Sequence, residues 1–389
     1  MEQYVMKMPK AVYSGSNALK SISGIVKGKY HKAAVFTDQG ITAAGLLGLV
    51  TDHLKEGGLE IEVLDNLAAE PSYHEAQEAV NWFRKTGADL IVAVGGGSVM
   101  DAAKLASIAA EGENGVARLL DDPLKGRKLV ETMMVPTTAG TGSEATPNSI
   151  VAVPEKELKV GIVNEAMLPD YVVLDGAMIK KLPKKIAAST GVDALAHGIE
   201  CFTSKKANPF SNLFAMEALK LIFPNIEKAC CDENAMEEKN NMLLAAFYAG
   251  AAITASGTTA VHALSYPLGG RYHIPHGVAN AMLLLPVMEF NRPTCLNEFA
   301  AVYDELKPGA GAESKEEKAD WVLGRMERII KNLEIPTSLT EFGIGMDDLD
   351  DLVKAGMEVK RLLNNNKRIV TAEDARKLYF SIMKTKQGN

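Results

Sequence analysis

Cysteine is scarce in this 389-residue sequence, and its placement argues against a disulfide framework. The four cysteines are Cys201, Cys230, Cys231 and Cys295, and none belongs to a Cys-X-X-Cys pair. Small secreted domains that depend on disulfides carry more cysteines at regular spacing. The sequence therefore predicts a protein of a reducing compartment, and we expect a cytoplasmic location.

Long hydrophobic runs and an excess of positive charge are also missing. No apolar stretch approaches the roughly 20 residues that a membrane-spanning helix requires. The N-terminal residues MEQYVMKMPK contain no apolar core of a signal peptide. The net charge of −7 offers no basic surface for nucleic acid. We therefore expect neither a membrane nor a nucleic-acid partner.

Apolar residues, by contrast, are plentiful, and at 47% they suffice for sizeable cores. A chain of 389 residues suits two domains. In the first half, short β-branched runs alternate with helical stretches, a pattern that predicts a parallel, open, twisted sheet. Strands are expected at 33–37, 60–64, 90–94, 133–135 and 171–174, a hairpin at 149–153 and 158–163, and helices at 41–56, 74–86 and from 99.

From Leu182 onward the hydrophobic period becomes that of helices. We therefore predict an α/β domain with an open, mostly parallel sheet over residues 1–180 and an all-α domain over residues 181–389. Helices are expected at 186–200, 208–230, 234–257, 278–291, 315–333, 347–363 and 371–385.

A glycine turn is the first chemical signal. Gly95, Gly96 and Gly97 follow a buried strand, and Ser98 is expected to cap a helix that starts near Val99. Glycines at a helix N-terminus let backbone N–H groups approach an anion such as a pyrophosphate. The segment does not match the Gly-X-Gly-X-X-Gly fingerprint, so a tight turn without a ligand stays open.

Polar residues follow the neighbouring strands. Asp38 ends the first expected strand, where a carboxylate can accept hydrogen bonds from a ribose diol and repel a 2′-phosphate. The alternative is an aspartate of an ordinary turn. Hydroxyl groups in the loop after residue 135, and Lys159 on the hairpin, are candidates to line a cofactor's phosphates and ribose, whereas the alternative is a solvated loop. The loop hydroxyls are Thr137, Thr138, Thr141 and Ser143.

The segment GVDALAHGIE, residues 191–200, carries the second signal. Asp193 and His197 are four residues apart, so on a helix they share one face. A helix with a capping aspartate and a satisfied histidine is the plain alternative. Further on, His262 is expected to end an apolar helix, with Pro267, Gly269 and Gly270 turning the chain. His276 is then expected in a stiff loop between Pro275 and Gly277.

One carboxylate with imidazoles suits a divalent transition metal such as Fe²⁺ or Zn²⁺. The four candidate ligands are Asp193, His197, His262 and His276. We therefore predict a metal site built from two short segments of the second half.

Four motifs in this order resemble the iron-containing, group III alcohol dehydrogenases, over nearly the whole chain. This resemblance implies a dehydroquinate-synthase-like architecture, with an N-terminal dinucleotide-binding domain, an all-helical C-terminal domain and the site in the cleft between them. It implies hydride transfer between NAD(H) and a small alcohol or aldehyde, with the substrate oxygen bound to the metal, and a homodimer or higher homo-oligomer. The motifs are GGGSVMDAAK (95–104), PTTAGTGSE (136–144), GVDALAHGIE (191–200) and HALSYPLGGRYHIPHG (262–277).

The resemblance also assigns roles residue by residue. It implies that the four candidate ligands above hold the metal, Fe²⁺ or another divalent ion, and that Asn148, Ile253 and Leu362 line the substrate pocket. NAD is expected rather than NADP, because the family's NAD-preferring members carry an aspartate at the position of Asp38. The remaining cofactor residues are expected to be Gly95, Gly96, Gly97, Ser98, Asp101, Thr137, Thr138, Thr141, Ser143 and Lys159.

The chain departs from the family pattern at Tyr266, where many members carry a histidine that relays the proton. Tyr266 or His273 is expected to take this role, with His273 favoured and release to water as the alternative. Other activities on the same fold also stay open. A dehydroquinate-synthase-like lyase would need a basic pocket, and only Arg271 lies near the ligands in sequence. A polyol or hydroxyacid dehydrogenase, or a non-catalytic metal- and nucleotide-binding protein, is also possible, although all four ligands are present.

Overall fold

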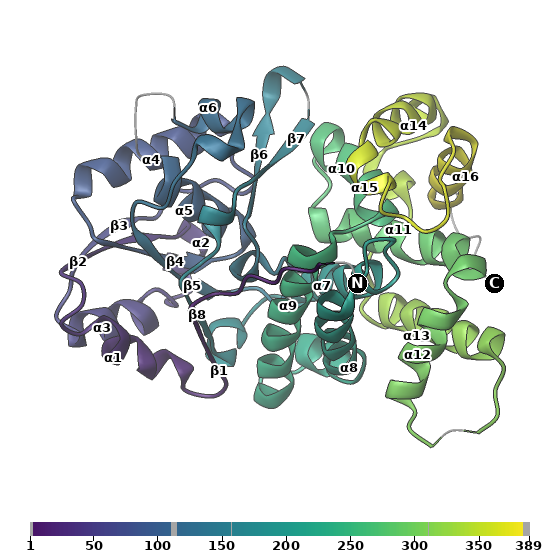
Figure 1. Cartoon of the computed structure of the whole chain (residues 1–389), viewed down its shortest axis with the longest axis horizontal. Helices are drawn as coiled ribbons and strands as arrows, with labels where there is room; N and C mark the ends of the chain where they lie inside the picture. The colour runs from purple at the N-terminus through teal and green to yellow at the C-terminus, as the bar shows by residue number, and fades with distance from the viewer. Residues whose placement is uncertain (1–2, 110–114, 157, 310, 384–389) are drawn as a thin grey trace. The chain divides into compact units, whose positions relative to one another are not determined.

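The structure is a computed structural model that describes residues 3–109, 115–156, 158–309 and 311–383. It contains two compact units (Figure 1). The sheet-containing unit comprises Lys7–Leu182 and Glu233–Gly250, and the helical unit comprises Met1–Met6, Pro183–Asp232 and Ala251–Asn389.

A six-stranded sheet forms the centre of the first unit, and every pair of neighbouring strands in it is parallel. The strand order is β1-β8-β5-β4-β2-β3. This arrangement confirms the parallel α/β sheet predicted from the alternating pattern. The strands are β1 (Ala11–Ser14), β2 (Lys32–Phe36), β3 (Glu60–Leu64), β4 (Leu90–Gly95), β5 (Glu131–Pro136) and β8 (Tyr171–Leu174).

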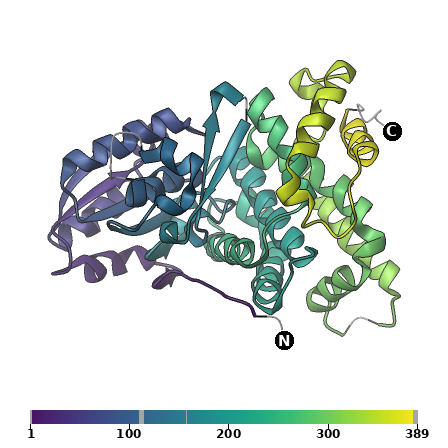
Figure 2. The same cartoon turned by 45° about the horizontal axis from the view of Figure 1, so that its top comes forward.

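Helices cover both faces of this sheet, as the views in Figures 1 and 2 show. On β4, Ile91 and Ala93 pack in the same cluster as α4 and α5, whereas Leu90 and Val92 pack in the cluster of α1 and α3. This alternation follows from the two-residue repeat of a strand and explains why β4 is buried throughout. The helices of this unit are α1 (Ser21–Val26), α2 (Gln39–Ala43), α3 (Gly48–Glu56), α4 (Tyr73–Thr86), α5 (Gly97–Ala109) and α6 (Gly115–Asp121).

The predicted hairpin forms beside the sheet as the antiparallel pair β6 (Asn148–Val153) and β7 (Leu158–Val163). Some local expectations were incomplete. The helix expected over 41–56 is split into α2 and α3, because Gly45 adopts a left-handed conformation with φ of 71°. The short elements β1, α1 and α6 were not anticipated.

The second half of the chain is helical, as predicted. Pro209 occupies the first position of its helix and Asn208 caps it, which is the preferred use of both residue types. The helices are α7 (Lys184–Phe202), α8 (Pro209–Cys231), α9 (Met236–Ser256), α10 (Ala260–Tyr272), α11 (His276–Asn291), α12 (Leu296–Leu306), α13 (Lys315–Asn332), α14 (Leu349–Glu358), α15 (Lys360–Leu363) and α16 (Ala372–Ile382).

Helix α9 contributes to both units, and its segment up to Gly250 belongs with the sheet. Within that unit, the Oδ1 atom of Asn240 accepts a hydrogen bond of 2.7 Å from the backbone N–H of Gly176. Gly142 and Gly250 meet so closely that a Cβ atom on Gly142 would lie 2.6 Å from Cα of Gly250. These contacts attach the first part of the helix to the loops that follow the strands.

Several expectations for the helical half were wrong in detail. His262 lies near the start of α10 and not at the end of a helix, and Pro267, Gly269 and Gly270 lie inside α10 instead of turning the chain. Burial of this helix outweighs the weak helix propensity of glycine and proline. His276 does not lie in a loop but begins α11, with Pro275 at the N-cap.

The C-terminal helices also differ from expectation. The helix predicted over 347–363 is interrupted at Val359, and α12 was not predicted. Residues 384–385 of the last predicted helix lie outside the described residues. No single helix in the described part of the chain meets the length and hydropathy criteria for a membrane span. The pair α9 and α10 passes only when taken together, although the two are bent by 106°.

Candidate metal centre and cofactor site

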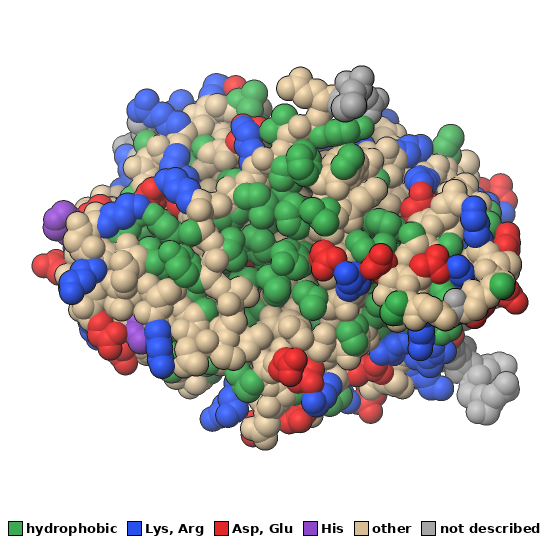
Figure 3. All heavy atoms as spheres, turned by 60° about the horizontal axis from the view of Figure 1, so that its bottom comes forward, with side chains coloured by type: hydrophobic (Ala, Val, Ile, Leu, Met, Phe, Trp, Pro, Cys, Tyr) green, Lys and Arg blue, Asp and Glu red, His purple; other side chains and the backbone are tan. Residues whose placement is uncertain are grey.

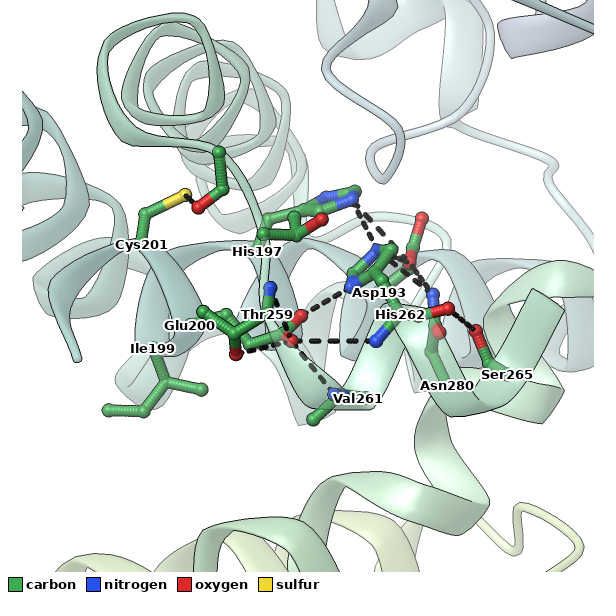
Figure 4. Close-up of polar contacts among 12 residues, drawn as sticks. Asp193, His197, Ile199, Glu200, Cys201, Thr259, Val261, His262, Ser265 and Asn280 are labelled. Atoms are coloured by element: carbon green, nitrogen blue, oxygen red, sulfur yellow. Dashed lines mark hydrogen bonds and ion pairs between the residues drawn. The ribbon is translucent and has the colours of Figure 1, made fainter. Parts of the chain in front are cut away.

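Four side chains of the helical unit converge on one point. Asp193 and His197 come from adjacent turns of α7, His262 from the first turn of α10, and His276 from the first position of α11. One donor atom from each lies within 4.8 Å of all the others. Figure 4 shows Asp193, His197 and His262 pointing toward one another. The structure thus brings together the four residues predicted as ligands.

The geometry of this cluster fits a divalent metal ion. The Oδ1 atom of Asp193 lies 3.7–3.8 Å from the Nε2 atoms of the three histidines, and Nε2 of His262 lies 2.9 Å from Nε2 of His197. A tetrahedron with metal–donor distances of about 2.0–2.2 Å has edges of about 3.3–3.6 Å. The donors therefore lie at separations that one ion can bridge.

The electrostatics favour a cation at the same point. Burial by itself would raise the pKa of Asp193, but the neighbouring His197, His276 and His262 outweigh it and hold the pKa well below its usual range. Burial likewise would lower the pKa of His262, yet Glu200 and Asp193 raise it to about 9. The lowered pKa keeps Asp193 ionised, and the raised pKa of His262 reports the negative charge of Glu200 and Asp193 at its ring, where a bound cation would also be stabilised.

Sequence reasoning missed Glu200, which supports His262 from behind. Glu200 is completely buried, and its Oε2 atom accepts a hydrogen bond from Nδ1 of His262 (Figure 4). Its Oε1 atom accepts hydrogen bonds of 2.9 Å from the backbone of Thr259 and of Val261. The signal was its spacing, because Glu200 lies seven residues after Asp193 and thus on the same helix face. Carboxylates behind metal-binding histidines commonly orient the ring in this way.

The glycine turn lies at the carboxyl edge of the sheet. Asp38 follows β2, the glycine turn begins at Gly95, the last residue of β4, and Thr137 follows β5. These three strands are neighbours in the sheet. A Cβ atom on Gly97 would come within 2.9 Å of the Thr141 side chain, so only glycine leaves this space open. The backbone N–H groups at the start of α5 suit a pyrophosphate, and the cradle fits a dinucleotide.

Other predicted cofactor residues have structural partners. Asp38 caps α2 by accepting a hydrogen bond of 3.0 Å from the N–H of Ile41. Ser98 lies in the first turn of α5 and does not cap it, so that expectation was wrong. Its hydroxyl accepts a hydrogen bond of 3.1 Å from the N–H of Glu70. The Glu70 carboxylate pairs with Lys159 at 2.7 Å. Ser98 and Lys159 are therefore linked through one residue.

A buried network lies behind the threonine-rich loop. The hydroxyl of Ser143 donates to Asp101 at 2.5 Å, and Asp101 also pairs with Lys104 at 3.0 Å. Lys104 is completely buried and donates to the carbonyl oxygen of Ser143 at 3.0 Å. Nearby Glu144 is also buried, and burial raises its pKa to about 7. Asp101 and Ser143 thus contact each other, and Lys104, which sequence reasoning did not single out, ties α5 to the loop.

The predicted loop threonines lie against the glycine turn. Thr137 is buried, and its backbone N–H donates to the carbonyl of Gly95 at 3.0 Å. Thr138 lies 3.5 Å from the position that a Cβ atom on Gly96 would take. The glycine turn and the loop therefore form one continuous wall, in which Thr138 and Thr141 flank the space beside the glycines.

The candidates for proton relay lie in different settings. The ring of Tyr266 is centred 6.2 Å from the ring of His276, whereas His273 is exposed at the end of α10 with φ of 54°. Among the residues predicted to line the substrate pocket, Asn148 begins β6 in the sheet unit. Ile253 on α9 and the buried Leu362 on α15 belong to the helical unit.

Two family models match this sequence. "Iron-containing alcohol dehydrogenase" matches residues 9–176, and "Fe-containing alcohol dehydrogenase family, C-terminal" matches residues 187–383. The two matches cover the sheet and the four metal-ligand candidates.

Curated proteins and solved structures agree with these matches. Long-chain-alcohol dehydrogenase 1 of Geobacillus thermodenitrificans is 33% identical over 89% of this chain and 88% of its own length. The NAD-dependent methanol dehydrogenase of Bacillus methanolicus is 30% identical over 94% of this chain and 96% of its own. The alcohol dehydrogenase from Oenococcus oeni superposes with a TM-score of 0.91 at 27% identity, covering 98% of this chain and 100% of that structure.

Proposed function

This chain belongs to the iron-containing alcohol dehydrogenase family, and from that premise we propose that it transfers a hydride between NAD(H) and a small alcohol or aldehyde. The observation that carries the proposal is the convergence of Asp193, His197, His262 and His276 within 4.8 Å. Both family matches and a complete set of donors argue for an active oxidoreductase and against a binding protein without turnover.

We propose that these four side chains hold one divalent ion, Fe²⁺ by family and Zn²⁺ or another divalent metal as alternatives. Such an ion supplies Lewis acidity toward an alcohol or carbonyl oxygen. The chain's own part is to present one carboxylate and three imidazoles from rigid helices, with Asp193, His197 and His262 all buried. Glu200 keeps the ring of His262 oriented, so that little ordering remains to be done when the site is filled.

For the cofactor, we propose that the turn Gly95–Gly97 receives the pyrophosphate and that Asp38 faces the adenine ribose. Nicotinamide supplies the hydride chemistry, and the protein supplies position. Ser98, Thr137, Thr138, Thr141 and Lys159 would complete this site. The buried contacts of Asp101 and Ser143 support a role in holding the loop beside the cofactor.

We further propose that Tyr266 moves the proton between the substrate oxygen and solvent. The sequence alone favoured His273, but the Tyr266 ring lies beside the ligand His276, whereas the His273 side chain is exposed. Asn148, Ile253 and Leu362 remain the proposed lining of the substrate pocket.

The test combines metal content with turnover. Purified protein loaded with Fe²⁺ or Zn²⁺ is expected to reduce NAD when short alcohols are supplied, and the NADH formed is followed by its absorbance. His262→Ala is expected to lose the metal and the activity together. His53→Ala changes a half-buried histidine on α3 that pairs with Glu56, and it is the matched control that should retain both. A His262→Ala protein with full metal occupancy and full turnover would refute the proposed site.

We also propose a cytoplasmic homo-oligomer. None of the four cysteines forms a disulfide in the described structure, which suits a reducing compartment. Figure 3 shows hydrophobic side chains gathered on the face in view, and such exposed apolar surface is typical of subunit interfaces. Sedimentation analysis should give a mass of at least two chains, and a monomer at micromolar concentration would contradict the oligomer.

A further inference from the structure

We propose that Asn280 is a positioning residue of the metal centre, whose side-chain amide orders Asp193 and the neighbouring histidines for metal binding. The inference rests on the proposed metal site and adds a residue to it. Asn280 lies on α11 four residues after His276, so both side chains project from the same helix face.

The amide of Asn280 contacts three of the four proposed ligands. Its Nδ2 atom lies 2.7 Å from Oδ1 of Asp193 and 3.1 Å from Nε2 of His262 (Figure 4). It also lies 3.1 Å from Nε2 of His276. The side chain is completely buried. The amide therefore touches the donor atoms themselves rather than the outer side of the ligand residues.

The chemistry of these neighbours determines which end of the amide faces them. The oxygen of Asp193 is an acceptor, and each imidazole nitrogen must keep a lone pair if it is to bind a metal. Only the NH₂ end of Asn280 can donate to such a group, since a carbonyl oxygen there would face acceptors. The N–H groups of Asn280 thus reduce the repulsion among the lone pairs of Asp193 and the histidines, which the helices bring close together.

The carbonyl end of the amide indicates why position 280 holds an asparagine. Hydrogen-bond donation, and not packing, is the reason. Oδ1 of Asn280 is buried and has no hydrogen-bond partner among the described residues. An unsatisfied buried acceptor destabilises the folded protein, and a leucine of similar size would avoid that loss. The energetic loss at Oδ1 is offset only if the Nδ2 contacts contribute something that an apolar side chain cannot.

The contact with Asp193 is the one that would remain if a metal ion were bound. The histidines would hold the ion through their Nε2 lone pairs, and these nitrogens would then no longer accept hydrogen bonds. The carboxylate of Asp193 has further lone pairs and can still accept from Asn280. Hydrogen bonds to ligating carboxylates commonly set their orientation, and loss of such a partner typically lowers metal affinity 10- to 100-fold.

The experiment measures metal affinity directly, independently of turnover. Metal-free wild type, Asn280→Leu and Asn280→Ala are titrated with Zn²⁺ against a competing chelator and with Co²⁺, whose visible spectrum reports ligand geometry. Asn291→Ala is the matched control, because Asn291 is also a buried amide on α11 but pairs with Asn366 at 2.8 Å. His262→Ala serves as the reference for loss of a ligand.

We expect both Asn280 variants to bind Zn²⁺ 10- to 100-fold more weakly and to show an altered Co²⁺ spectrum. Asn291→Ala should bind with wild-type affinity even where its melting temperature falls. If His262→Ala loses the metal while both Asn280 variants keep wild-type affinity and spectrum, the role of Asn280 is overturned and the proposed function stands. If His262→Ala retains wild-type affinity, the metal site itself is wrong, and this inference fails with it.

Discussion

The carboxylate of Glu200 accepts a hydrogen bond from Nδ1 of His262, and this contact turns Nε2 of the same ring toward Asp193. The tautomer follows from the partners, because a carboxylate can only accept and the Nδ1 atom must therefore carry the hydrogen. The interacting residues are 62 positions apart in the sequence. A buried charge thus supports a ring that we propose as a metal ligand, and this contact can be tested separately from the ligands.

Glu200→Gln is expected to weaken Zn²⁺ binding about 10- to 100-fold, because the negative charge that makes the ring more basic is removed. A chelator-competition titration measures this change. Thr259→Val is the control, since it deletes only the hydroxyl that donates to Glu200 at 2.7 Å and leaves the bond to His262 intact. Equal losses in both variants would show that general packing, and not the carboxylate, is responsible.

Cofactor preference should depend on the charge of Asp38. Wild type is expected to prefer NAD, since a carboxylate in this position would repel the 2′-phosphate of NADP. Asp38→Gly should shift the ratio of kcat/KM values toward NADP. Asp38→Asn separates charge from structure, because an asparagine can still cap α2. A wild type that prefers NADP, or ratios unchanged in both variants, would contradict the assignment.

The proton relay should appear in the pH dependence of kcat/KM. An unperturbed tyrosine titrates near pH 10 and a histidine near pH 6.5, so only a histidine relay adds an inflection near neutrality. Given its place beside His276, Tyr266→Phe is expected to lower the rate, whereas the exposed His273→Gln should change little. If an inflection near neutral pH is lost only in His273→Gln, His273 and not Tyr266 is the proton relay. If both variants keep the wild-type pH profile of kcat/KM, neither residue relays the proton, and the proton is released directly to water.

The close contact of Gly250 with Gly142 should hold in place the loop of residues 137–143, which we propose to line the cofactor site. A side chain on Gly250 would collide with the backbone of Gly142, and such overpacking costs about 1–3 kcal/mol. Gly250→Ala is therefore expected to lower stability and to raise the Kd for NAD roughly tenfold, which corresponds to about 1.4 kcal/mol. Gly324→Ala on α13 is the control, because the nearest atom to its added Cβ lies 3.7 Å away. If Gly250→Ala binds NAD as tightly as wild type, the contact between Gly250 and Gly142 does not influence NAD binding.

Stability should fall with rising pH because of Glu144. Burial raises its pKa from the usual 4.5 to about 7, so the folded protein keeps this proton where the unfolded chain has released it. Unfolding then releases a proton, and the stabilisation present below pH 4.5 is lost as the pH rises to about 7. The loss amounts to roughly 3 kcal/mol. Urea unfolding at pH 5 and pH 7.5 measures it.

Glu144→Gln provides the comparison, since it keeps the shape and cannot titrate. Its free energy of unfolding should fall less between the two pH values than that of wild type, by up to roughly 3 kcal/mol. Parallel curves for the two proteins would mean that the Glu144 proton is bound equally in the folded and unfolded states.

The repeating patterns of the sequence were sufficient to predict most elements and half of the metal site. The two-residue repeat predicted the parallel strands, and the helical period predicted the long helices. The spacing of Asp193 and His197 placed them on one face because both lie within a single helix, where local geometry decides which side chains are neighbours. His262 and His276 were added by residue type, because one carboxylate with several imidazoles suits a divalent transition metal.

Tertiary structure alone decided the groups that support these residues. Glu200, Asn280 and Lys104 look like ordinary helix residues in the sequence, and each acquires its role from a partner on another element. Burial also decided that α10 continues through Pro267, which local propensity argued against. The physical reason is common to these cases: the energy of a buried polar or packed group depends on neighbours that only the folded chain supplies, whereas strand and helix periods depend on residues a few positions away.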